Sequence, residues 1–106
     1  MGIGTTTPSV NLHISSSATD FAQVRVEAAS DGYDTSVAYS QAGTIKGISG
    51  YDDSTDTVAI KYGTFSGGGI DIDSNGKVGI GTDSPSYELD VVGEIGLDSY
   101  LRHNGS

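Results

Sequence analysis

The sequence predicts an all-β protein with almost no helix. Ile and Val together number 17 residues and Thr numbers ten, whereas Leu and Met together number five. β-Branched side chains lose rotamer freedom in helices and pack well on a pleated sheet. Short runs of alternating apolar and polar residues are separated by turn-forming pairs such as Asp31–Gly32 and Asn75–Gly76. Short strands at this spacing are typical of a sandwich, a barrel or a fibrous β assembly.

An internal repeat brackets the chain. Gly2–Ile14 aligns without gaps on Gly79–Val91, and seven of 13 positions are identical at a constant offset of 77. Each copy places an isoleucine between two glycines, which permits close approach of the backbone. A proline then interrupts strand pairing, and apolar residues recur after it with period two. Each copy therefore predicts a linker followed by a half-buried strand.

The residues between the two copies predict further short strands. Phe21–Ala28 alternates, with alanine and valine on one face and Gln, Arg and Glu on the other. Asn75–Gly76 is a strong hairpin signal that connects the run before it to Val78. The remaining runs have the same alternation or β-branched character, and they are Val37–Tyr39, Ile45–Ile48, Thr57–Tyr62 and Ile70–Asp73.

Charge and composition exclude several classes of protein. The net charge is −9, and five basic residues cannot neutralise a track of phosphates, which excludes a simple nucleic-acid binder. The acidity disfavours docking on an anionic membrane, and no apolar run reaches the roughly 18–20 residues of a membrane span. The chain contains no cysteine, so it has neither disulfides nor thiolate metal sites. Leu, Ile, Val and Phe make up only 23 of 106 residues, and such a chain can still fold if partner chains bury part of its surface.

The second copy and the residues before it carry a family resemblance. Ile72–Val91 reads IDSNGKVGIGTDSPSYELDV, which resembles the IDSxGxVGIGTxSPxxxLDV segment of long bacteriophage tail fibres. Similar segments occur in bacterial trimeric mosaic adhesins. Gly2–Ile14 is a weaker match, and the residues between the copies are similar to the variable β region that often lies between two such segments.

The resemblance implies a homotrimeric, intertwined β fibre. Its middle would be a small β-sandwich or a prism-like region, flanked by shaft repeats. The expected organisation is shaft repeat 1–14, middle region 15–69, shaft repeat 70–93 and the start of a further, truncated β segment at 94–106. The first copy also lacks the lead-in that precedes Gly79, so we expect the chain to be cut from something longer. The resemblance implies adjoining fibre segments as partners and a location on a virion, or alternatively on a bacterial cell surface.

The expected function is structural. A shaft would extend and present a receptor-binding tip for attachment to a host cell, with no catalytic residue and no cofactor. Three chains around one axis could bury apolar stripes that a single chain leaves exposed. The residues expected to pack in the trimer are Ile3, Leu12, Ile14, Ile80, Leu89 and Val91, and the glycines expected to permit close approach are Gly2, Gly4, Gly79 and Gly81.

Three weaker patterns suggest metal sites. Asp71, Asp73 and Asn75 match the opening of a calcium loop, but Thr82 stands where the loop needs a bidentate glutamate, which favours a plain hairpin turn. Aspartates also cluster at 52–56, where a solvated turn is the ordinary explanation. In a trimer, three copies of His13 could meet on the axis and bind a metal or an anion.

The alternative function is a receptor-binding module carried on a fibre stalk. Tyr33, Tyr39 and Tyr51 lie in the middle region, where exposed rings could contact a glycan or protein on the host surface. Packing within a thin β core is the competing role for these tyrosines. Catalysis is not expected, because the 15 serines and two histidines form no recognisable triad and a chain this short builds no large cleft.

Overall fold

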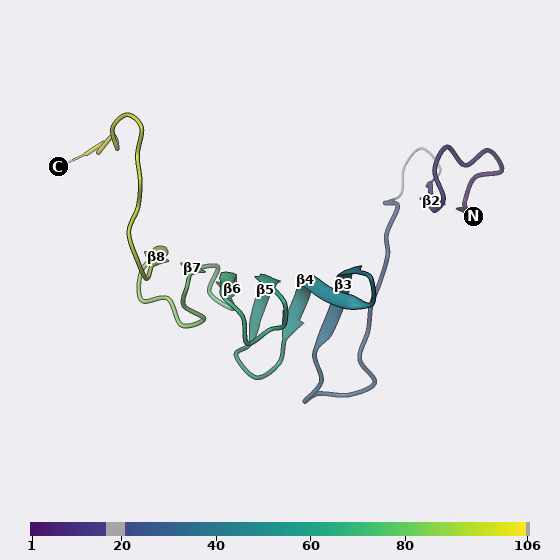
Figure 1. The fold of residues 1–106 in the computed structure, drawn as a ribbon, viewed down its shortest axis with the longest axis horizontal. Coiled ribbons are helices and arrows are strands. Elements are labelled where there is room, and N and C mark those ends of the chain that lie inside the picture. The colour runs from purple at the N-terminus through teal and green to yellow at the C-terminus, as the bar shows by residue number, and fades with distance from the viewer. Residues whose placement is uncertain (17–20, 106) are drawn as a thin grey trace.

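A computed structural model describes residues 1–16 and 21–105. Residues 17–20 of the predicted middle region and Ser106 of the predicted terminal segment lie outside the described residues. The described chain is all-β and contains no helix, as the sequence predicts (Figure 1). Its eight strands are β1 (Gly2–Ile3), β2 (His13–Ile14), β3 (Thr35–Gln41), β4 (Thr44–Asp52), β5 (Thr57–Tyr62), β6 (Gly69–Asp73), β7 (Val78–Ile80) and β8 (Leu89–Val91).

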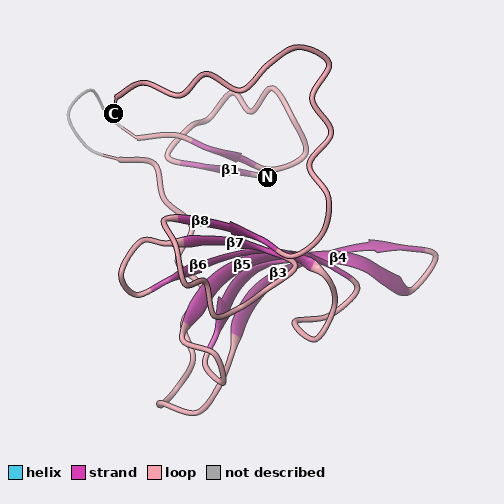
Figure 2. Ribbon diagram, turned by 90° about the vertical axis from the view of Figure 1, so that its left-hand side faces the viewer, coloured by secondary structure: helices cyan, strands magenta, loops and turns pink. Residues whose placement is uncertain are grey.

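Strands β3 to β8 form one six-stranded sheet in which the strand order follows the chain. The first five strands are antiparallel, and β8 pairs parallel to β7. Tight turns set this order. Ala42 and Gly43 join β3 to β4 with φ values of 50° and 78°, and Gly76 has a φ of 81° in the predicted Asn75–Gly76 turn. Figure 2 shows the strands fanning out with a strong twist and no second sheet stacked on them.

The N-terminal repeat forms a separate two-stranded parallel sheet. Gly2 pairs with His13 and Ile3 with Ile14. In the second copy, Gly79 pairs with Asp90 and Ile80 with Val91, which are the same pairs shifted by 77 residues. Among the described residues, the strands of the small sheet make no contact with those of the large one.

The two copies also share their local hydrogen bonds. The backbone N–H of Ser15 donates to the carbonyl of Ile3 at 2.8 Å, and its counterpart Val92 donates to Ile80 at 2.9 Å. In the turn of the first copy, the backbone N–H of Thr7 donates to Thr5 Oγ1 at 3.2 Å. In the second copy, the backbone N–H of Ser84 donates to Thr82 Oγ1 at the same distance. The predicted linker-plus-strand module is therefore a repeated structure as well as a repeated sequence.

Several strand predictions differ from the structure. Phe21–Ala28 is not part of any ladder, because it pairs with no strand of the described chain. Alternation gives a segment an apolar side, but a strand forms only where a neighbouring strand pairs with it. In the repeats, the predicted alternation begins at Val10 and Tyr87, but the paired strands begin only at His13 and Leu89. The turn after each proline occupies the residues between.

The chain is far more open than a compact domain. Its radius of gyration is 18.0 Å, against about 13 Å for a globular protein of this length. Its accessible surface is 8436 Å², whereas a compact protein of 10.8 kDa exposes about 5,500 Å². Ile48, Ala59 and Pro85 are the only buried apolar side chains in the described part of the chain. A single chain therefore has almost no hydrophobic core of its own.

Candidate functional site

The dominant surface feature is an apolar face on the large sheet. Residues opposite each other in neighbouring strands point to the same side, and along one strand that side recurs every second residue. Val58 pairs with Ile72, Ile60 with Ile70, and Ile70 in turn with Ile80. Continued across the sheet, this register defines the apolar face, whose members are Val37, Tyr39, Tyr51, Val58, Ile60, Tyr62, Ile70, Ile72, Val78, Ile80, Leu89 and Val91.

The apolar face is open to solvent in the single chain. Ile60, near its centre, is 61% exposed, Val58 is 54% exposed, and Ile70, Ile72 and Ile80 are 40–42% exposed. Complete burial of one such side chain is worth about 1.5–3 kcal/mol. A continuous apolar surface over several strands marks an interaction site in a soluble protein.

The structure divides the predicted packing residues between the two sheets. Ile80, Leu89 and Val91 lie on the apolar face, at the end of the sheet formed by the second repeat. Ile3 and Ile14 are paired with each other in the small sheet, and Leu12 immediately precedes its second strand. Ile3 and Leu12 are about half exposed, at 49% and 50%.

Sequence reasoning did not single out the centre of the apolar face. Val58, Ile60, Ile70 and Ile72 provide that centre, although the packing residues were sought in the repeats. The signal was present, because these residues alternate with Ala59, Lys61 and the two aspartates of β6. The alternation does not show which of the two sides of the sheet is exposed to solvent in a single chain.

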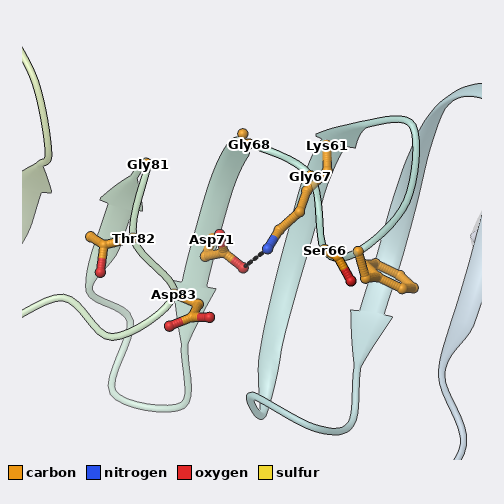
Figure 3. Close-up of a pocket in the computed structure, with 10 residues that line it drawn as sticks. Lys61, Ser66, Gly67, Gly68, Asp71, Gly81, Thr82 and Asp83 are labelled. Atoms are coloured by element: carbon orange, nitrogen blue, oxygen red, sulfur yellow. Dashed lines mark ion pairs between the residues drawn. The ribbon is translucent and has the colours of Figure 1, made fainter.

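The opposite side of the sheet is called the polar face here, and at its centre it carries buried polar side chains beside the buried Ile48 and Ala59. Thr57, Asp71 and Lys61 have exposed fractions of 1%, 2% and 7%. Lys61 Nζ lies 3.1 Å from Asp71 Oδ1, and the Thr57 hydroxyl donates to the same oxygen at 2.9 Å (Figure 3). Because a charge removed from water needs a partner, the ion pair satisfies both groups. The buried side chains at the centre of the sheet thus lie on the polar face, whereas the apolar face is exposed to solvent.

A hollow of about 370 Å³ opens on the polar face. The Lys61–Asp71 pair lies on its wall, between the loop after β5 and the loop after β7, as Figure 3 shows. The first loop contributes residues 65–68 to the lining, Gly69 at the start of β6 follows it, and the second loop contributes Gly81–Asp83. The lining of the hollow therefore combines an aromatic ring, charged side chains and the backbone of several glycines.

The candidate calcium residues have structural partners. Asp71 is held in the ion pair with Lys61, and Asp73 Oδ1 accepts hydrogen bonds from the backbone N–H groups of Asn75 and Lys77, both at 2.9 Å. This bonding is that of a hairpin turn closed by an aspartate. Nowhere in the described ranges do three or more His, Asp or Glu side chains gather as metal ligands would.

His13 also has a local partner. Its Nδ1 accepts a hydrogen bond from the backbone N–H of Ser9 at 3.2 Å. In the second repeat, Asp90 Oδ2 accepts from Ser86 N–H at 2.9 Å, at the equivalent positions. The shared contact closes the turn in each copy, so His13 has a structural role within one chain.

The three candidate receptor-binding tyrosines differ in their surroundings. The hydroxyl of Tyr51 donates to Asp56 Oδ1 at 2.9 Å, and this hydrogen bond raises the pKa of Tyr51 above its usual 10.0, with smaller contributions from desolvation and nearby aspartates. The hydroxyl of Tyr39 lies 3.2 Å from that of Ser49. Tyr39 and Tyr51 belong to the apolar face, whereas Tyr33 precedes β3 and is 66% exposed.

The acidic loop at 52–56 is ordered by its own side chains. Asp52 Oδ1 accepts hydrogen bonds from the Ser54 hydroxyl at 2.6 Å and from the Ser54 backbone N–H at 3.0 Å. The hydroxyl contact is the main reason that the pKa of Asp52 falls below its usual 3.8, and it outweighs the opposite effect of burial. The loop is therefore a closed turn.

Ser54→Ala is expected to destabilise the fold in a pH-dependent manner. Because the pKa of Asp52 is lower in the folded state than in the unfolded state, its contribution is present above about pH 4 and is lost as the pH falls through the folded value. We expect a loss of about 1–2 kcal/mol at pH 7 and a smaller loss at pH 2.5. Urea unfolding of both proteins at the two pH values measures this, and an equal loss at both would contradict it.

The predicted close-approach glycines contact their own chain. A Cβ on Gly2 would collide with the carbonyl oxygen of Thr5, and a Cβ on Gly79 would collide with that of Thr82. Gly4 and Gly81 have φ values of 74° and 75°, in the left-handed region that side chains other than glycine rarely adopt. The repeat thus needs its glycines to shape the turn within each chain.

Gly79→Ala is expected to destabilise the protein by more than about 1 kcal/mol, because the new methyl group would force the Thr82 backbone to move. Gly68→Ala is the matched control, since nothing lies within 4 Å of the position that the new Cβ would occupy and the φ of Gly68 is not left-handed. Thermal unfolding of both variants measures the difference. Equal melting temperatures would show that the turn adjusts without cost.

The comparisons with known proteins leave the family open. In the part of the chain that the structure describes, no helix has the length and apolar character needed to cross a membrane. The chain matches no known family model, and it matches no curated protein. The functional argument therefore rests on the apolar face, the polar face and the repeated module.

Proposed function

We propose that the chain is a structural segment of a homotrimeric fibre, of the tail-fibre or adhesin kind, that extends and presents a receptor-binding tip. The observation that carries the proposal is the exposed apolar face opposite a buried polar face. In this role three copies turn their apolar faces toward a common axis and form together the core that one chain lacks. The polar faces then lie outside. The function is mechanical rather than catalytic.

The area of the exposed surface supports a permanent assembly. The chain exposes about 2,900 Å² more than a compact protein of its mass would. Obligate interfaces bury about 2,000–5,000 Å² and resemble a divided domain core. The number three and the location on a virion or a bacterial surface come from the resemblance of Ile72–Val91 to fibre segments. A prism of three sheets is consistent with a single layer per chain.

Sedimentation velocity tests the fibre function. The assembly is expected to sediment more slowly than a sphere of the same mass, because an elongated shaft has more friction with solvent. The sedimentation coefficient measured at several concentrations, with the mass fixed independently, gives the shape. A compact, nearly spherical particle would contradict the shaft.

A receptor-binding module is the second candidate. The hollow on the polar face favours it, because Phe65 could stack on a sugar ring while Asp83 and Thr82 bond its hydroxyls. Tyr33 supplies a further exposed ring. A glycan array with the unchanged protein and the Asp83→Asn and Tyr33→Ala variants tests it. Binding that either variant reduces supports this candidate, and a blank array counts against it.

A further inference from the structure

Residues 21–28 are an extended segment without a partner. In Figure 1 the segment follows the grey trace as a stretch that belongs to neither sheet. Phe21 is 93% exposed, Val24 66% and Val26 49%, and the segment makes no hydrogen bond within the described residues. Residues 22–28 alternate apolar and polar, and the whole segment lacks glycine and proline, which is the composition of a strand.

The large sheet has one free edge that matches this segment in length. β3 is seven residues long and pairs only with β4, so its outer N–H and C=O groups have no strand beside them. It lacks proline and charged side chains, which are the usual protection of an exposed edge. The other edge, β8, has only three residues. An eight-residue strand therefore fits β3 far better than β8.

Pairing on β3 would continue both faces of the sheet. The apolar side of the segment, with Val24 and Val26, would extend the apolar face beyond Val37 and Tyr39. The side that carries Arg25 would extend the polar face. In the same chain, residues 29–34 separate the segment from β3, a connection longer than the two to five residues usual in hairpins. The described chain forms no such hairpin.

We propose that residues 21–28 of one chain add as a strand to the free edge of β3 in a neighbouring copy. This inference rests on the proposed homotrimer and specifies how its chains interlock. Around a threefold axis each copy both donates a segment and accepts one, so the exchange closes on itself. Main-chain hydrogen bonds then supplement the packing of the apolar faces.

Disulfide mapping tests the exchange, and the absence of native cysteine makes it unambiguous. Arg25→Cys is combined in turn with Ser36→Cys, Ala38→Cys or Ser40→Cys, which covers registers two residues apart in either strand direction. Ser36 and Ala38 lie on the polar side of β3, and in the proposed pairing Arg25 would lie on the same side, whereas Ser40 follows the bulge after Tyr39. The variants are oxidised, and their masses are compared on denaturing gels with those of the four single-cysteine controls.

The expected result is a ladder of covalent dimers and trimers in at least one double variant. None of the single-cysteine controls is expected to give such products in comparable yield. Disulfides only within one chain, or none in any double variant, would overturn the exchange. Light scattering on the same reduced samples separates the two proposals. A trimer with disulfides only within chains removes the exchange and leaves the fibre function, whereas a monomer removes the fibre function.

Val24→Pro provides a second measurement, because proline removes a ladder donor yet interrupts no hydrogen bond of the isolated chain. Its melting temperature is expected to fall by about 5 °C or more. Ala29→Pro, just outside the segment, is the matched control. Equal melting temperatures for the two proline variants would contradict strand exchange.

Discussion

Ile60→Asp is expected to convert the assembly into monomers at micromolar concentration. Ile60 lies near the centre of the apolar face, opposite Ser49 on one side and Ile70 on the other. In the proposed trimer three carboxylates would enter the shared core, and an unpaired buried charge costs several kcal/mol. The side chain is 61% exposed in the single chain, so the substitution does not disturb packing within that chain.

Light scattering before and after the substitution measures the change in mass. Ile95→Asp is the matched control, because Ile95 is 66% exposed but lies outside both sheets. Leu89→Asp, at the end of the apolar face, is also expected to weaken the trimer. An unchanged mass and melting temperature for Ile60→Asp would show that the apolar face is not the assembly surface.

Lys61→Met is expected to lower the free energy of unfolding by about 3–5 kcal/mol, because it leaves the Asp71 carboxylate buried without its cation. The remaining hydrogen bond from Thr57 does not neutralise that charge. Chemical denaturation of the assembled protein at fixed concentration measures the loss, since the stability of an oligomer depends on its concentration.

The double variant Lys61→Met with Asp71→Leu separates the contribution of the ion pair from the cost of burying its charges. Replacement of both ions by apolar groups is expected to restore most of the stability, because the unpaired charge disappears along with its desolvation cost. If the double variant loses as much free energy of unfolding as the two single variants together, the two side chains act independently. A stable Lys61→Met variant would show that the polar face is open to water.

The strands with local partners are those that the sequence predicts best. Thr57–Tyr62 is predicted and observed with the same bounds, because its alternation is strict and both neighbouring strands lie close to it in the chain. The strand predicted at Ile45–Ile48 extends over Thr44–Asp52, since the ladder includes Ser49 and Gly50, and neither residue gives an apolar signal in the sequence. Phe21–Ala28 fails as a ladder strand because alternation does not reveal whether a partner edge lies in the same chain.

The site could be predicted only in part. The glycines of the repeat were recognisable as close-approach positions, but the sequence did not show that Gly79 approaches Thr82 in its own chain. The Lys61–Asp71 pair joins residues on neighbouring strands that are ten positions apart, so it depends on the register of β5 against β6. Alternation shows that the sheet has two unlike sides, and only the structure shows that the apolar one is bare.

The mass of the protein in solution tests the central claim most directly. Light scattering over a wide range of concentrations, with and without chelator, is expected to give a stable particle of three times 10.8 kDa that does not depend on metal ions. A particle of that mass contains three copies, so two further copies would be available to cover the surface that each chain leaves exposed. A well-folded monomer of 10.8 kDa, with its apolar face in water, would contradict the claim.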